Sequence, residues 1–117
     1  MHNNSFPASL KNAIDYLYAE WNGKVVGVVG YGAHGGMRAI DHLRAVFAEV
    51  KALVVPTEVS LEVMVDFDFS GFDPGDRTAT GVCAPRAPQQ AALATMLDDV
   101  VDTVASTRAR ARQRVAV

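Results

Sequence analysis

The stretch that decides the fold spans residues 24–36 and reads KVVGVVGYGAHGG. Its first half, residues 24–29, is short, rich in valine and apolar at nearly every position. Unbroken apolarity of this kind is typical of a strand covered on both faces, as the strands of parallel sheets are. Its second half, residues 30–36, is rich in glycine. We therefore predict a buried strand that is followed by a glycine-rich loop.

The residues after the glycines complete a βαβ unit. Apolar side chains recur at helical spacing up to about residue 50, with Ile40, Leu43, Phe47 and Val50 on one stripe. Residues 52–55 form a second short apolar run, and Pro56 is expected to stop it. A strand, a crossover helix and a second strand form a right-handed unit with a parallel sheet. The predicted fold class is therefore α/β.

Further elements are expected on both sides of this unit. Ser5 and Pro7 predict a helix start, because a cap oxygen is followed by a proline in the first turn. Residues 59–65 alternate between apolar and polar side chains, which predicts an extended segment with one buried face. Residues 66–88 are rich in Gly, Pro, Asp and Thr and predict a long surface connection. Residues 89–106 predict a final helix.

The chain ends in a tail that carries Arg108, Arg110, Arg112 and Arg114 at alternate positions. A tail of this composition is expected to fray in solvent. An arm that binds phosphate is the alternative interpretation, because blocks of like charge often mark interaction tails.

Composition limits the classes of function. A length of 117 residues fits one domain, and residues 1–117 are treated as a single domain. A net charge of −2 gives no basic footprint for nucleic acid. The chain has no signal-like start and no run near the roughly 20 apolar residues of a membrane helix. The single cysteine, Cys83, suits a reducing compartment. We expect a cytoplasmic protein with neither nucleic acid nor membrane as a partner.

The glycines also match a known ligand-binding pattern. Gly30, Gly32 and Gly35 fit the dinucleotide fingerprint G-x-G-x-x-G between a strand and a helix. That pattern normally has an acid about 20 residues later that holds a ribose. Here the nearest acid, Glu58, lies beyond Pro56. A nucleotide-binding Rossmann fragment and a tight turn without a ligand both stay open as interpretations.

Several short motifs occur in an informative order. Residues 3–7 read Asn-x-Ser-x-Pro, and residues 10–15 read Leu-Lys-Asn-Ala-Ile-Asp. Gly-Lys at 23–24, the glycine loop at 30–36 and Val-Pro-Thr at 55–57 follow. This series resembles NAD(P)H-dependent FMN reductases of the flavodoxin-like superfamily, in which Pro-Glu-Tyr-Asn precedes such a helix. The resemblance runs from Asn3 to about Leu61 and continues loosely through the last helix.

The resemblance implies a flavodoxin-like three-layer fold with a partial parallel sheet. It also implies NAD(P)H-dependent reduction of FMN, or of an acceptor served through FMN such as a quinone, a dye or a metal oxyanion. The cofactors would be FMN and NAD(P)H, and no catalytic acid–base residue or metal ligand is expected because the cofactor carries the hydride chemistry. The flavin-binding residues that the resemblance implies are Asn3, Asn4, Ser5, Gly30, Tyr31, Gly32, His34 and Gly35.

The resemblance covers the carboxyl-terminal portion of the family only. The family's first strands and its Ser/Arg-rich phosphate loop have no counterpart in these residues, so FMN binding by this chain is expected to be weak or absent. In the strand order 2-1-3-4-5, residues 24–29 would be the fourth strand and residues 52–55 the fifth. Residues 24–29 would then form a sheet edge, with Leu10, Ile14 and Ile40 exposed nearby.

Soluble proteins normally cover an apolar sheet edge. We therefore expect a homo-oligomer, with residues 24–29 or the first two helices at the interface. A non-catalytic α/β module that mediates assembly is the alternative function.

Overall fold

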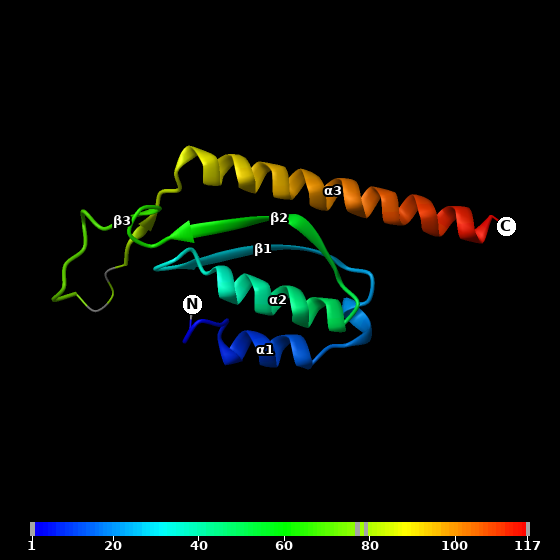
Figure 1. Cartoon of the computed structure of the whole chain (residues 1–117), viewed down its shortest axis with the longest axis horizontal. Helices are drawn as coiled ribbons and strands as arrows, with labels where there is room; N and C mark the ends of the chain where they lie inside the picture. Colours follow the sequence, from blue (N-terminus) through cyan, green and yellow to red (C-terminus); the bar gives the residue numbers. More distant parts are fainter. Residues whose placement is uncertain (1, 77, 79, 117) are drawn as a thin grey trace.

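The computed structural model describes residues 2–76, 78 and 80–116. Its parallel sheet, in the described part of the chain, consists of two strands that lie side by side. Two helices cover one face of this sheet and a third, longer helix covers the other face (Figure 1). The elements in chain order are α1 (Ala8–Asp15), the 3-10 turn η1 (Ala19–Trp21), β1 (Val25–Gly32), α2 (Met37–Glu49), β2 (Leu53–Glu62), β3 (Phe67–Asp68), β4 (Val82–Cys83) and α3 (Ala87–Val115).

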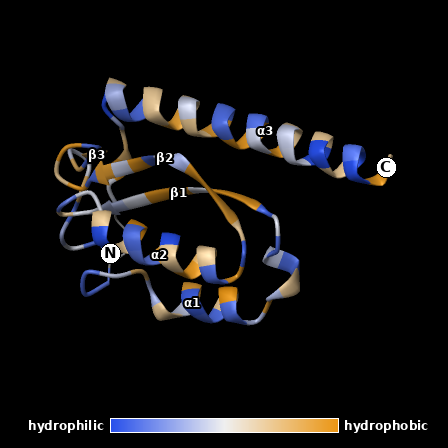
Figure 2. Cartoon of the chain, turned by 45° about the vertical axis from the view of Figure 1, so that its right-hand side comes forward, coloured by the Kyte–Doolittle hydropathy of each residue, from blue (hydrophilic) through white to orange (hydrophobic). Residues whose placement is uncertain are grey.

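This three-layer arrangement agrees with the predicted α/β class. Apolar residues line both strands and one side of each helix (Figure 2). On the face covered by α1 and α2, Ile14, Val28 and Ile40 belong to one buried cluster. On the opposite face, Val59 and Met96 belong to another buried cluster. The helices are therefore held to the sheet by burial of apolar surface on both sides.

The prediction that Ile14 and Ile40 would be exposed is wrong. Their side chains are 1% and 0% exposed, because both lie in the buried cluster of α1, α2 and β1. Trp21 packs against this cluster and donates from Nε1 to the Ile14 carbonyl oxygen at 3.0 Å. Leu10 is 38% exposed, as predicted. The two helices thus form a compact layer on a two-stranded sheet.

The first strand is longer than predicted, because β1 runs through Gly32 rather than ending at residue 29. Val28 and Gly30 are buried on the α2 side of the sheet, whereas Val29 is exposed. A Cβ atom at Gly30 would lie 2.8 Å from Cδ1 of Ile40. Glycine is therefore required there so that Ile40 can pack directly on the strand.

The expected stop at Pro56 is also wrong, since β2 continues from Leu53 to Glu62. Val26 pairs with Val54 but Val28 pairs with Glu58, so β2 bulges around Pro56. Proline is tolerated at a bulge because its missing N–H is not needed in the ladder. The extended segment predicted at 59–65 is the second half of this same strand as far as Glu62.

The side chain of Arg44 on α2 fills the hydrogen-bonding gap that this bulge leaves. Arg44 donates to the carbonyl oxygens of Val55 and Pro56, each at 3.0 Å. It also forms an ion pair with Glu58, with 2.9 Å between Nη2 and Oε2. Arg44 therefore connects the bulge of β2 to α2.

The carboxyl-terminal half differs most from the prediction. The expected surface connection contains the short antiparallel pair β3–β4; residues 77 and 79 of that connection lie outside the described residues. The last helix, α3, extends to Val115, so the arginine tail is helical rather than frayed and projects past the sheet (Figure 1). Arginines in a last helical turn interact favourably with the helix dipole. In the described chain no helix is long and apolar enough to span a membrane.

The helix start predicted at Ser5 is wrong in its detail. The residue that caps α1 is Pro7, and no side chain caps the helix. A hydrogen bond of 2.9 Å joins Ser5 Oγ to His42 Nδ1 on α2 instead. Ser5 thus fastens the amino-terminal segment to the second helix.

Candidate functional site

The carboxyl ends of β1 and β2 lie at the same end of the molecule as the amino-terminal segment and the start of α2 (Figure 1). Ligands of open α/β sheets bind at this edge, where loops and helix amino termini converge. The chain topology therefore brings residues 2–5 and the glycine loop together, although about 25 residues separate them in the sequence.

The amino-terminal segment forms a tight turn. The backbone N–H of His2 donates to the Ser5 carbonyl at 2.8 Å, and the N–H of Ser5 donates back at 2.9 Å. Asn3 and Asn4 between them have φ angles of 48° and 62°. Asparagine tolerates this left-handed conformation better than most residues do. Residues Asn3 and Asn4 thus have a defined conformation at the edge of the site.

The glycine loop turns sharply between β1 and α2. Gly35 and Gly36 both have left-handed φ angles, 68° and 69°. The N–H of Gly35 donates to the carbonyl of Gly32 at 3.2 Å, and Ser60 Oγ donates to the carbonyl of Gly35 at 2.9 Å. A Cβ at Gly36 would lie 2.8 Å from the backbone nitrogen of Tyr31. Close packing of the turn on both strands is reason enough for these two glycines.

The site residues predicted from sequence fall around neighbouring hollows. Ser5, Gly30 and Tyr31 line a hollow of about 210 Å³ together with His2. Its floor is apolar and comes from α1 and α2. Asn4 and His34 line a second hollow, of about 440 Å³. Asn3, Gly32 and Gly35 are not among the lining residues of either hollow.

The second hollow lies at the amino terminus of α2. Met37 and Arg38, from the first turn of that helix, line it with Asn4 and His34. Backbone N–H groups at a helix amino terminus are directed toward such a space and favour negative charge. Sequence reasoning did not single out Arg38, which adds a permanent positive charge here. This arrangement suits electron-rich oxygen atoms of a ligand.

An aromatic pair borders the site. The rings of Tyr31 on β1 and Phe67 at the start of β3 have centroids 6.0 Å apart and planes inclined by 48°. The Tyr31 side chain is 57% exposed. Aromatic faces, amide donors and a guanidinium group fit the ring portion of a flavin, which is planar and carries carbonyl oxygens.

Asp66 accepts several hydrogen bonds that the sequence did not predict. Asp66 lies in the turn between β2 and β3, and its side chain is fully buried. It accepts hydrogen bonds from the backbone N–H of Glu62 at 2.8 Å and from the backbone N–H, Nε and Nη2 of Arg86, each at 2.9 Å. These bonds from Arg86 hold the pKa of Asp66 far below its usual range, against the opposing effect of burial. A lone acid in a loop-like segment gives no periodic signal that could have revealed this contact.

No group of three or more His, Cys, Asp or Glu side chains in the described residues is placed to hold a metal ion. The acid nearest to a ribose-binding position, Glu58, is engaged by Arg44. The chemistry available at this edge of the sheet is therefore that of backbone amides, His34, Arg38 and the aromatic rings.

A parallel α/β sheet with a glycine turn and a helix amino terminus at its carboxyl edge defines a class of proteins that bind nucleotides or flavins. The family model for NADPH-dependent FMN reductases matches residues 1–66. The chain belongs to this family, and the resemblance inferred from the sequence motifs is confirmed. The family also accounts for the flavodoxin-like α/β fold.

Three curated relatives carry the name NAD(P)H-dependent FMN reductase. The relative from Schizosaccharomyces pombe is 39% identical over 84 residues, which are 72% of this chain and 37% of that protein. The relative from Saccharomyces cerevisiae is 50% identical over 54 residues, or 46% of this chain and 28% of that protein. The relative from Nectria sp. is 40% identical over 76 residues, or 63% and 38%. The chain thus spans about a third of the length of these relatives.

Proposed function

We propose that this chain supplies the flavin-ring side of an NAD(P)H-dependent FMN reductase site. The observation that supports this proposal best is the pair of hollows beside the amino-terminal segment, one lined by Tyr31 and the other by His34 and Arg38. The 117 residues would then form one incomplete flavodoxin-like domain. The proposed cofactor-binding residues are Asn3, Asn4, Ser5, Gly30, Tyr31, Gly32, His34 and Gly35.

The roles of these residues are positioning and electrostatic stabilisation. Bound FMN would supply the hydride chemistry between NAD(P)H and an acceptor. Amide donors at the start of α2 and the guanidinium of Arg38 would face the side of the ring where reduction places negative charge. The Tyr31 ring would limit how the flavin plane can tilt. The acceptors that we propose, by family, are quinones, dyes and metal oxyanions.

We expect FMN and riboflavin to bind this chain about equally and weakly. The family's phosphate loop has no counterpart in these residues, and the proposal assigns Arg38 and the start of α2 to the ring oxygens rather than to the phosphate. Fluorescence titrations with both flavins would measure the two Kd values. Arg38→Ala should weaken both to a similar degree, and Glu49→Ala, exposed at the far end of α2, should weaken neither.

A much tighter Kd for FMN than for riboflavin would contradict this prediction. It would point to an anion site elsewhere in the chain, and the arginines at the end of α3 would be the first candidates to substitute. Stabilisation by NAD(H) without any flavin would instead favour the Rossmann alternative, since a ligand that binds only the folded state raises apparent stability. The ion pair between Glu58 and Arg44 speaks against that alternative.

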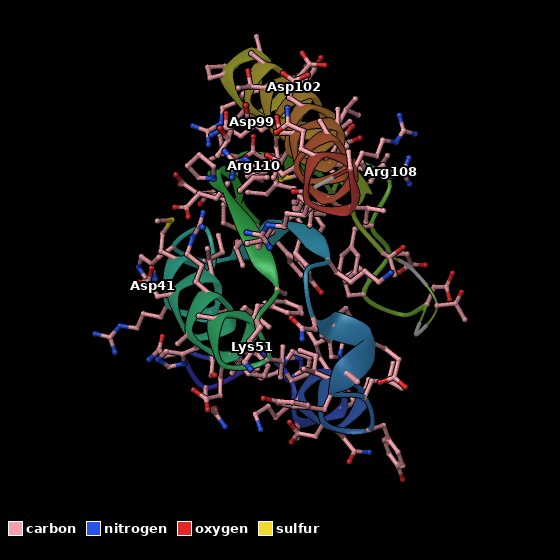
Figure 3. The ribbon with its side chains drawn as sticks, turned by 90° about the vertical axis from the view of Figure 1, so that its right-hand side faces the viewer. Asp41, Lys51, Asp99, Asp102, Arg108 and Arg110 are labelled. Carbon is pink, nitrogen blue, oxygen red and sulfur yellow. The ribbon has the colours of Figure 1, made fainter. Side chains whose placement is uncertain are left out.

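We further propose that the chain forms a homo-oligomer through β1. In the described residues β2 is the one strand that pairs with β1. Val29 on β1 is 47% exposed, and Leu97 and Val101 on α3 are also exposed. The same flank of α3 carries Arg108, which lines a hollow with Lys24 of the β1 side, whereas Asp102 and Arg110 lie on the opposite flank (Figure 3). A second copy that pairs with β1 would cover this surface.

Val29→Lys tests this assembly. A lysine on an exposed strand edge opposes further pairing, so the dissociation constant of the oligomer should rise by about tenfold or more. Light scattering over a dilution series would measure it, with Val82→Lys on β4 as the matched control. A wild-type chain that is a clean monomer at micromolar concentration would show that the proposal is wrong.

We also propose a cytoplasmic location, which the exposed thiol of Cys83 supports because a reducing compartment keeps thiols free.

A further inference from the structure

Phe67 stands outside every motif of the sequence, yet it contacts the proposed flavin site. It begins β3, five residues after the last residue of β2. Its ring lies 6.0 Å from that of Tyr31, centroid to centroid. Phe67 also packs against the buried cluster that contains Met96 of α3. One part of its ring is therefore fixed in the core while another part faces a side chain of the site.

The backbone around Phe67 is held by the bonds between Asp66 and Arg86. Arg86 donates three hydrogen bonds to the buried carboxylate of Asp66, and the N–H of Ala84 donates to the Asp66 carbonyl at 2.8 Å. Phe67 itself pairs with Cys83 in the β3–β4 ladder. The bonds of Asp66 therefore hold together the backbone before β3 and the backbone after β4. Phe67 is the first residue after Asp66.

The described part of the segment between β3 and β4 contains two further phenylalanines. Phe69 and Phe72 contact each other, with ring centroids 6.2 Å apart, and their side chains are 39% and 47% exposed. Phe69 lies over Gly81, where a Cβ would collide with its ring. These aromatic residues pack within their own segment. Phe67 is distinguished by its contact with Tyr31 and by the anchored backbone on either side.

We propose that Phe67 and Tyr31 form a two-ring wall that binds the planar isoalloxazine ring, with Asp66 and Arg86 as positioning residues. This inference rests on the proposed function and adds residues to it. Paired aromatic faces attract a planar heteroaromatic ring by stacking and by burial of apolar surface. The wall stands at the carboxyl end of β1, where Tyr31 precedes His34 of the glycine turn by three residues.

The experiment is a titration of the full ¹⁵N-labelled chain with FMN, followed by NMR. Amide shifts should change at Tyr31 and Phe67, and inorganic phosphate alone should leave both unchanged. A second titration with NADPH in place of FMN compares a nicotinamide ring with the isoalloxazine ring. If the wall is selective for isoalloxazine, the amide shifts should be larger with FMN. Wild-type chain that binds FMN without shifts at either amide would overturn the wall and leave the proposed function standing. No FMN binding at millimolar concentration would overturn both.

Variants give the second arm of the test. Phe67→Leu keeps an apolar side chain for the core and loses the ring, so affinity for FMN should fall by about three- to tenfold. Tyr31→Leu should lower affinity for FMN by a similar factor. The double variant should lose little more affinity than either single variant. Phe67→Tyr should keep the wild-type affinity. Phe72→Leu, in the same segment but away from Tyr31, is the matched control and should bind FMN as the wild type does.

The positioning role has its own readout. Arg86→Lys loses the forked contact with Asp66 and should lower affinity for FMN in the wild-type chain. In the Phe67→Leu background it should have no further effect, because there is then no ring to position. An equal loss in both backgrounds would assign Arg86 to stability alone and overturn its role as a positioning residue.

Discussion

Gly36→Ala should destabilise this chain severely, whereas Gly23→Ala should cost little. Both glycines have nearly the same left-handed φ, 69° and 74°. An alanine pays about 1 kcal/mol for that conformation at either position. At Gly36 the added Cβ would also lie 2.8 Å from the backbone nitrogen of Tyr31 and 3.0 Å from its carbonyl oxygen. At Gly23 no atom lies within 4 Å of the new Cβ.

The difference between the two variants therefore isolates the steric cost. Backbone atoms of a strand paired in the sheet cannot move aside as a side chain can, so Gly36→Ala should lose about 3 kcal/mol or more in total. That is a large share of the 5–15 kcal/mol by which domains are usually stable. Urea unfolding followed by circular dichroism would give both free energies. Similar losses at the two positions would mean that the turn can open without cost.

The glycines of this loop have a packing role. The sequence pattern suggested glycines that let a ligand approach the backbone. The structure provides a packing reason for three of them: Gly30 accommodates Ile40, Gly35 accommodates Ser60, and Gly36 accommodates the backbone of β1. Packing of helix on strand and ligand binding at the same turn are compatible, because a close-packed turn directs the amide groups of α2 outward.

The central βαβ unit could be predicted because its strands are apolar on both faces and its helix is periodic. The predictions were wrong where local contacts overrode the usual structural preference of a residue type. Gly30 and Gly32 suggested a loop, since glycine weakens strands, but the strand continues through them. Pro56 suggested a strand end, but a bulge removes the need for its N–H, and Arg44 satisfies the freed carbonyls.

The site was predictable only in part. The resemblance to FMN reductases grouped residues 3–5 with the glycine loop, because ligands of open α/β sheets bind at the carboxyl edge of the strands. The pair of Asp66 and Arg86 could not be found this way, since 20 residues of irregular composition separate its members. The full length of α3 was hidden by its arginine-rich end, which has no apolar stripe to reveal a helix.

Asp66→Asn should lower stability at neutral pH, and the loss should depend on pH. Asparagine keeps the shape of the side chain but removes the charge that accepts three hydrogen bonds from Arg86. The buried carboxylate is the acceptor for the half-exposed Arg86, which is then left with Glu62 at 3.7 Å as its ion-pair partner. We expect a Tm lower by roughly 10 °C at pH 7. Asp98→Asn, at an exposed position on α3, should change Tm far less.

The sign of the pH dependence follows from the direction of the pKa shift. Hydrogen bonds from Arg86 lower the pKa of Asp66 in the folded chain from its ordinary value of 3.8. A carboxyl group with a lowered pKa contributes its full stability above the unfolded value, and that contribution is lost as the pH falls further. The difference in unfolding free energy between wild type and Asp66→Asn should therefore be constant from pH 8 to about 5 and shrink below about pH 4. Urea titrations at several pH values would measure this difference in free energy. If the difference grew on acidification, the charge on Asp66 would not be what holds the start of α3 to the end of β2.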